Sequence, residues 1–239
     1  MSATLPKPHP GALPAYLRIA ERLTIEIGAG RLSPGDRLPP ERRMADAHGV
    51  SVMTLRKALA VVADRGLIER RQGSGNYVRE GGRNVGTYAF FRLEAVPDGG
   101  GLPTARLIGL DHLPKPAGRT LGSDASHAWR IRRLRALDGV DVALEEIWLD
   151  GRFGALRADQ LSESLYKSYA ERLDLTIARA EDRVGSGALP DWTPEAFHLP
   201  PGHVTGLVER QSFDQNRRLA ETSRTWFDTG RARYFASVP

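Results

Sequence analysis

The first third of the chain carries apolar side chains at the spacing of amphipathic helices. Within residues 15–28 they recur every three or four positions, which predicts a helix with one buried stripe formed by Tyr16, Ile19, Ala20, Leu23 and Ile27. A short second helix is expected over residues 41–48, closed by Gly49. A third helix is expected to open at Ser51, a good N-cap residue, and to end at Gly66.

The third helix has a core side and a polar side. Its apolar stripe follows the i, i+3, i+4, i+7, i+8 pattern and consists of Leu55, Ala58, Leu59, Val62 and Ala63. Met53 and Lys57 point away from this stripe. Thr54 and Arg56 lie on its two flanks. The N-terminal half of this helix therefore presents a polar, basic surface while its back belongs to the core.

A hairpin is expected directly after these helices. Residues 67–71 and 75–79 are strand-like and flank a Gln-Gly-Ser-Gly tip. A phosphate cradle needs its glycines between a strand and the start of a helix, whereas here a second strand-like segment follows, so the glycines indicate a tight turn. Three helices and a hairpin predict a winged helix-turn-helix, with the third helix in a DNA major groove. Arg70 and Arg71 would then lie beside backbone phosphates or the minor groove.

Charge and composition narrow the class of protein. Residues 1–80 hold 13 Lys and Arg against 8 Asp and Glu, whereas residues 81–239 hold 21 of each. A basic first third favours a polyanionic partner, although five excess charges alone are equally compatible with a solvated basic surface. The absence of cysteine excludes disulfides and thiolate chemistry. No apolar run has the length of a membrane span, and residues 1–13 form a Pro-rich lead expected to be disordered, so a cytoplasmic protein without a membrane partner is expected.

Beyond a Gly-rich linker expected over residues 80–87, the pattern becomes α+β. Residues 129–137 and 140–149 are strand-like and joined by Asp138-Gly139, a strong hairpin signal. A helix is expected over residues 160–173. Further strands are expected in DLTIARAEDRV, GHVTGLVERQSF, RRLAETSRTWF and RARYFASV, with a helical or turn segment near TPEAF. This order predicts a mainly antiparallel sheet with few helices.

The motifs of residues 14–79 match a known family. GRLSPGDRLP, the ER pair, GVS, the TLRKAL run and GLIERRQGSG together resemble the DNA-binding domain of the GntR family of bacterial transcription regulators. The resemblance implies DNA contacts at Arg42, Ser51, Thr54, Arg56, Gln72 and Gly73. Val52 stands where the family often has an arginine, which leaves at most a contact to a thymine methyl group there. Pro40 stands where the family commonly has a serine, so the second helix loses that N-cap side chain.

Residues 88–239 resemble a second known domain. The order RRLRALDGVDVALEEIWL, then SESLY, then LAETSRTWF is similar to the UTRA effector domain of the HutC subfamily, whose fold resembles chorismate lyase. The resemblance implies an effector-binding and dimerising domain whose ligand site is formed by Arg133, Arg135, Glu145, Ser164 and Glu221. Ser223 shares a strand face with Glu221 and is a further candidate.

The strand pattern of the hairpin at residues 129–149 also bears on the ligand. Alternation places Arg133 and Arg135 on one face of the strand, where two arginines are costly to bury without an anion and together suit a phosphate or carboxylate. The alternative is an internal ion pair between either arginine and Glu145 that holds the sheet. Periodicity does not choose between Glu145 and Glu146, because both faces of their strand are apolar; the resemblance implies Glu145.

These features predict a ligand-responsive, sequence-specific regulator. We expect a homodimer on a palindromic operator in double-stranded DNA, acting as a repressor released by a small anionic or polar metabolite. One alternative is an enzyme of chorismate lyase-like fold, but the six histidines show no metal-binding spacing and no nucleophile–base pair is visible. Another is a non-specific nucleic-acid-binding module, but the basic domain holds only two aromatics for base stacking, Tyr16 and Tyr77. No catalytic residue, metal ligand or cofactor is expected.

Overall fold

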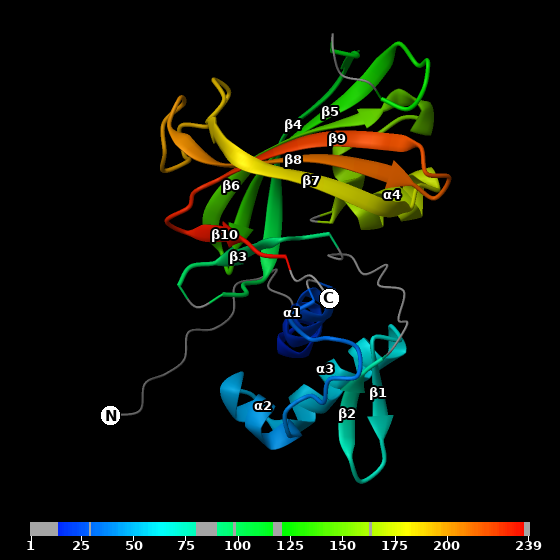
Figure 1. Cartoon of the computed structure of the whole chain (residues 1–239), viewed down its shortest axis with the longest axis vertical. Coiled ribbons are helices and arrows are strands. Elements are labelled where there is room, and N and C mark those ends of the chain that lie inside the picture. Colours follow the sequence, from blue (N-terminus) through cyan, green and yellow to red (C-terminus); the bar gives the residue numbers. More distant parts are fainter. Residues whose placement is uncertain are drawn as a thin grey trace. The chain divides into compact units, whose positions relative to one another are not determined.

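The chain divides into two compact units, one within the first 89 residues and one over Phe90–Ala236, and each is described by itself (Figure 1). The structure is a computed structural model that describes residues 14–28, 30–79, 90–97, 99–116, 121–162 and 164–236. The expected lead over residues 1–13 and linker over residues 80–87 lie outside the described residues.

The first unit contains three helices and a hairpin, as predicted. Its elements are α1 (Ala15–Gly28), α2 (Glu41–Ala47), α3 (Val52–Asp64), β1 (Ile68–Arg71) and β2 (Gly75–Val78). The apolar stripes of the helices meet in one core, in which Leu55, Ala58 and Val62 of α3 are fully buried. Gly66 adopts a φ of +71°, a left-handed conformation that suits glycine, and thereby ends α3 before the hairpin.

The loop before α2 pairs with the hairpin through an isolated β-bridge. The backbone N–H of Leu38 donates to the carbonyl of Asn76 at 2.9 Å, and that of Val78 donates to the carbonyl of Asp36 at 2.9 Å. Arg37 lies opposite Tyr77 in an antiparallel bridge. The segment that leads into α2 is therefore fixed against β2. This pairing positions Arg37 beside the hairpin of β1 and β2, which we call the wing.

The second unit is built on a six-stranded antiparallel sheet in the order β4-β5-β6-β9-β8-β7 (Figure 1). Its elements are β3 (Leu93–Ala95), β4 (Pro103–Pro114), β5 (His127–Leu137), β6 (Val140–Asp150), α4 (Leu165–Leu173), β7 (Ile177–Ala188), β8 (Val204–Asp214), β9 (Leu219–Phe227) and β10 (Ala232–Tyr234). Strands β3 and β10 form a separate antiparallel pair. The α+β class is confirmed.

Both faces of this sheet are covered. On one face, Ile131 of β5 and Ile147 of β6 pack with Tyr169 of α4. On the other face, Leu134 and Leu144 pack with apolar residues of the segment between β7 and β8, which are Leu189, Trp192, Phe197 and Leu199. The predicted hairpin is confirmed, since Asp138 and Gly139 turn with φ of 48° and 82°.

Two expectations for this unit were wrong or incomplete. The helix predicted over residues 160–173 begins only at Leu165, because Ser164 caps it by accepting a hydrogen bond from the backbone N–H of Lys167, while Ala158–Gln160 forms a 3-10 turn. The long strand β4 was not predicted. As an edge strand with a bulge between Leu107 and Gly109, it lacks a regular alternation of apolar residues.

Candidate nucleic-acid interface and ligand site

The start of α3 is fixed by a side-chain cap. The Oγ of Ser51 accepts a hydrogen bond from the backbone N–H of Thr54 at 3.1 Å, and the two hydroxyl oxygens lie 2.9 Å apart. This cap satisfies an N–H group that has no partner within the helix. Ser51 therefore organises the end of α3 at which base contacts are predicted.

The polar side of α3 is as the sequence predicts. Met53, Arg56 and Lys57 are exposed, whereas Thr54 is half-buried. Val52 is also half-buried and packs against the core of the first unit. The surface at this helix end is therefore formed mainly by long, flexible side chains, and the valine contributes at least part of its surface to packing.

Arg56 is held by the neighbouring helix. Its Nε donates to Oε2 of Glu41, the first residue of α2, at 2.7 Å. The Arg56 side chain remains 56% exposed, whereas the Glu41 side chain is only 20% exposed. One edge of the guanidinium is thus bound to α2, while most of the side chain stays accessible.

The wing presents its arginines differently. The Nε of Arg71 donates to Oε1 of Glu69 at 2.7 Å, and its guanidinium lies 4.3 Å from the ring centre of Tyr77. Arg70 is exposed and forms no ion pair or side-chain hydrogen bond with any residue that the structure describes. At the tip, Gln72 and Gly73 are exposed, and Arg42 is exposed on α2. The predicted DNA-contacting residues therefore lie on α2, α3 and the wing of a single unit.

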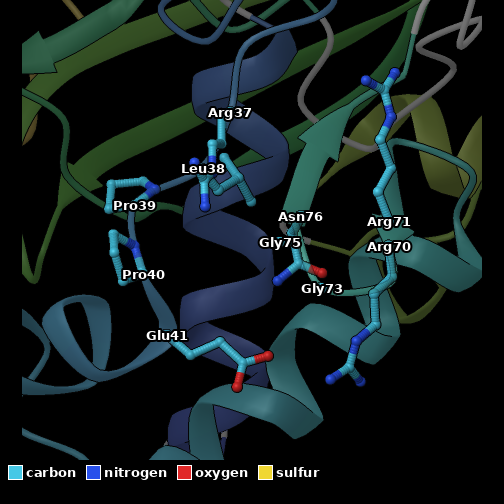
Figure 2. A pocket seen from close by; sticks show the side chains of 10 residues that line it. All are labelled: Arg37, Leu38, Pro39, Pro40, Glu41, Arg70, Arg71, Gly73, Gly75 and Asn76. Carbon is cyan, nitrogen blue, oxygen red and sulfur yellow. The ribbon is translucent and has the colours of Figure 1, made fainter.

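A hollow of about 240 Å³ lies between the wing and the segment that enters α2 (Figure 2). Arg37, Pro40 and Glu41 line it from one side, and Arg70, Gly75 and Asn76 from the other. Figure 2 shows the side chains of Arg70 and Arg71 leaving the strand in opposite directions, as alternation requires. Arg37 was not predicted from the sequence, because its approach to the hairpin depends on the pairing of its loop with β2.

The residues predicted to bind a ligand in the second unit include an ion-pair cluster around Glu145. Arg133 lies directly opposite Glu145 in the sheet and donates to its Oε2 from Nε at 2.9 Å and from a terminal nitrogen at 2.5 Å. A terminal nitrogen of Arg135 lies 3.5 Å from the same oxygen. Both arginines are buried, at 5% and 7% exposure. Burial favours the neutral carboxyl, but the charges of Arg133 and then Arg135 outweigh it and hold the pKa of Glu145 below its usual value.

The choice between the two glutamates is decided by geometry. Glu146 points to the other face of the sheet, where its Oε2 accepts from Nε of Arg132 at 2.9 Å and its Oε1 accepts from the indole N–H of Trp148 at 3.0 Å. Of these two neighbouring glutamates, Glu145 is the one that shares a face with Arg133 and Arg135. The cross-strand ion pair considered from the sequence therefore exists, and it involves both arginines.

Glu221 lies on the same face and is 2% exposed. Its carboxylate accepts hydrogen bonds from Tyr166 at 2.9 Å, Ser212 at 3.0 Å and Tyr169 at 3.1 Å. Burial nevertheless raises the pKa of Glu221, only partly offset by these three hydrogen bonds, and the nearby charge of Glu145 adds to the rise. The pKa values of Glu145 and Glu221 are thus shifted in opposite directions, because Glu145 is paired with cations whereas Glu221 is bound by neutral hydroxyl donors.

The two candidate serines occupy different places. Ser223 is buried on β9, two residues from Glu221 and opposite Ile147. Ser164 is buried at the N-cap of α4, where its Oγ accepts from the N–H of Lys167 at 3.4 Å. Ser164 therefore has a structural role in addition to any contact with a ligand.

A further charged pair on this face was not predicted. Arg210 of β8 lies opposite Ser223, and its Nε and a terminal nitrogen each donate to Asp182 at 2.6 Å. Tyr234 also donates to Asp182, at 2.7 Å. Burial would lower the pKa of Arg210, but the hydrogen bonds with Asp182 raise it, so the guanidinium stays charged. Alternation alone would have placed Arg210 between Val208 and Ser212 on this face, but it does not identify Asp182 as the partner.

Among the residues that the structure describes, no group of three or more His, Asp and Glu side chains is arranged to hold a metal ion. No described helix is long and apolar enough to cross a membrane.

Comparison with known proteins divides the chain into two domains, as the two compact units of the structure do. Residues 15–78 match the family described as bacterial regulatory proteins, gntR family, and residues 100–233 match the UTRA domain. The chain is 47% identical over 229 residues to the HTH-type transcriptional regulator SmoD of Agrobacterium fabrum, covering 95% of this chain and 97% of that protein. It is 29% identical over 182 residues to the mannosyl-D-glycerate transport/metabolism system repressor MngR of Escherichia coli, covering 73% and 75% of the two chains.

Solved structures share the fold. YydK of Bacillus subtilis superposes with a TM-score of 0.53 at 20% identity, over 95% of this chain and all of that one. PhnF of Mycobacterium smegmatis superposes with a TM-score of 0.50 at 22% identity, over 91% of this chain and 98% of that one. The names of the relatives are those of regulators of transcription rather than of enzymes.

Proposed function

We propose that this chain, which belongs to the GntR family of bacterial regulatory proteins and carries a UTRA domain, is a cytoplasmic repressor that leaves its operator when a small anion binds beside Glu145. A ligand-responsive DNA-binding regulator is the function common to this pair of domains. The sign of regulation, the homodimer, the class of ligand and the residues that bind DNA and ligand are the proposed part.

The observation that carries the ligand class is the meeting of Arg133 and Arg135 at one carboxylate oxygen. Two guanidinium groups held this close repel one another, and burial strengthens the repulsion because the local dielectric constant is low. An added phosphate or carboxylate would offset that repulsion, and it offers pairs of oxygens that the planar guanidinium can bind in a bidentate manner. A neutral ligand would leave the repulsion in place.

The neighbouring groups suit a hydroxyl-bearing ligand. Glu145 and Glu221 are acceptors on the same face, and Tyr166 and Ser223 can donate or accept. The name of the Escherichia coli relative refers to mannosyl-D-glycerate, a sugar linked to glycerate, which carries a carboxylate. We therefore place the ligand of this chain among sugar derivatives that carry a carboxylate, phosphate or similar anionic group.

The DNA side of the function rests on one exposed surface of the first unit. The side chains of Arg42, Arg56 and Lys57 would reach the major groove and its edges, with Ser51, Val52 and Thr54 at the start of α3. Arg70, Arg71, Gln72 and Gly73 would place the wing on the adjacent backbone and minor groove. A homodimer would present two such surfaces to the half-sites of a palindrome.

A thermal-shift screen tests the ligand class. Sugar phosphates and sugar acids are compared with the corresponding neutral sugars, at matched ionic strength, because a ligand of the folded state raises the melting temperature. We expect a rise only with anionic members, and release of an operator duplex by the same compounds. A neutral sugar that stabilises the protein and releases the operator equally well would contradict the proposed anion site.

A further inference from the structure

The hollow between the wing and the start of α2 is positively charged. It is lined by three arginines, Arg37, Arg70 and Arg71, and by one acidic residue, Glu41. Glu41 already binds Arg56, and Arg71 already binds Glu69. Arg37 and Arg70 have no carboxylate partner among the residues that the structure describes. Two guanidinium groups at this hollow are therefore uncompensated.

The position of Arg37 is set by the backbone rather than by a flexible loop. Hydrogen bonds from Leu38 to Asn76 and from Val78 to Asp36 pair its segment with β2 on either side of it. Its Nε lies 3.5 Å, and a terminal nitrogen 3.7 Å, from where a side chain on Gly75 would begin. Gly75 has a φ of +118°, which disfavours any residue with a side chain. The guanidinium of Arg37 is consequently held against the bare backbone near the tip of the wing.

The location of the hollow matches the path of a DNA strand. If α3 enters a major groove and the wing tip enters the neighbouring minor groove, the sugar–phosphate strand that separates the two grooves must pass between them. The hollow opens between the wing and the first residue of α2, which is itself tied to α3 through Arg56. Arg37 and Arg70 flank this passage (Figure 2).

We propose that this hollow seats a backbone phosphate of the operator, with Arg37 as a phosphate-contacting residue in addition to those of α2, α3 and the wing. The contact fixes the register of the protein on the duplex and carries no sequence information, because phosphates are the same at every base pair. This proposed phosphate contact adds a residue to the proposed DNA-binding surface, and it rests on the proposed DNA-binding function.

Salt-dependent binding tests the proposal with the full-length protein. Affinities of wild type, Arg37→Ala and Arg37→Gln for a random-sequence duplex are measured over a range of salt concentrations. Each lost phosphate contact lowers the steepness of log affinity against log salt by roughly 0.9. We expect both variants to lose about this amount and Arg37→Lys to retain the wild-type slope. A slope unchanged in Arg37→Ala and Arg37→Gln would overturn the proposal.

Arg18→Ala is the matched control. Arg18 is exposed on α1 and forms no ion pair among the described residues. Its replacement by alanine removes one positive charge from the same unit, as Arg37→Ala does. The salt dependence of Arg18→Ala should equal that of wild type. If its slope fell by as much as that of Arg37→Ala, only net charge would matter, and the assignment of a phosphate site to the hollow would be overturned. A wild-type protein that binds no duplex at all would instead contradict the DNA-binding function itself.

A free anion is the other source of the same chemistry. Inorganic phosphate is added to the wild type and to Arg37→Ala at constant ionic strength, and the melting temperature is recorded. We expect no phosphate-specific rise in either protein. A rise that Arg37→Ala abolishes, together with an unchanged salt slope, would assign the hollow to a small anion rather than to DNA.

Discussion

The Nε of Arg56 on α3 donates to Oε2 of Glu41 on α2 at 2.7 Å, so the predicted base-reading arginine is oriented by the helix beside it. The pair is largely exposed on the arginine side, and exposed ion pairs contribute at most about 1 kcal/mol to stability. The main effect of this ion pair is therefore to orient the Arg56 side chain and not to stabilise the fold.

Loss of either partner should reduce sequence discrimination. Arg56→Ala is expected to lower affinity for the operator by about 1–3 kcal/mol while leaving the melting temperature nearly unchanged. Glu41→Gln keeps Arg56 but weakens its orientation, and it removes a negative charge facing DNA. We expect it to weaken specific binding without weakening binding to a scrambled duplex. Titrations of both duplexes at one salt concentration measure this, and an unchanged specificity ratio in both variants would refute the positioning role.

The cap of α3 makes a separate prediction about stability. Ser51→Ala removes the acceptor for the N–H of Thr54 and should destabilise the first unit by about 1 kcal/mol. Ser51→Asn, which retains a capping oxygen, is the control and should stay close to wild type. Urea unfolding followed by a probe of the first unit distinguishes them. Equal stability of Ser51→Ala and wild type would show that the cap contributes nothing.

The two buried arginines should differ in their importance for folding. Arg133 makes two hydrogen bonds to Glu145, whereas Arg135 lies 3.5 Å away. Arg133→Ala leaves Glu145 without its main partner and is expected to destabilise the domain by about 3–5 kcal/mol, as for other broken buried pairs. Arg135→Ala should cost clearly less, because Arg133 still neutralises Glu145, yet it should abolish the response to ligand. Unfolding curves and ligand-dependent operator release of the two variants provide the comparison; an equal loss of stability, with release intact in Arg135→Ala, would make Arg135 a structural residue only.

Glu221 predicts a pH dependence of stability. Because burial raises its pKa in the folded protein, the folded state holds this proton more tightly than the unfolded state. Ionisation of Glu221 therefore weakens the fold as pH rises from the ordinary carboxyl range through the raised pKa. Glu221→Gln lacks this ionisation, so its comparison with wild type reports the titration of Glu221 together with its coupling to Glu145. The stability of the variant relative to wild type should thus increase as pH rises above the ordinary carboxyl range. A difference in unfolding free energy that does not change with pH would contradict the raised pKa.

Local patterns predicted most of the fold because each element has its own signal. The stripe of α3 and the Asp138-Gly139 turn are encoded within a few residues, and both were found where expected. The start of α4 was misplaced because the decisive feature is a single capping contact of Ser164. Strand β4 was missed because its partner β5 covers only one of its edges and a bulge interrupts its alternation.

The sites were predictable in part for the same reason. Strand alternation brought Arg133 and Arg135 to one face, but only the observed pairing with β5 shows that Glu145 and not Glu146 shares it. The pair of Arg210 and Asp182, and the approach of Arg37 to Gly75, each join segments far apart in the chain. No spacing along the sequence reports such contacts.

In the proposed function, a ligand bound to the second unit controls the binding of DNA by the first. The most direct measurement is the affinity of the full-length protein for its operator duplex, at fixed salt, with and without a saturating compound from the thermal-shift screen, together with the affinity for that compound with and without operator. Linkage requires the two affinities to change by the same factor, and we expect a decrease of about tenfold or more in each. An operator affinity that stays constant at saturating ligand would contradict the account.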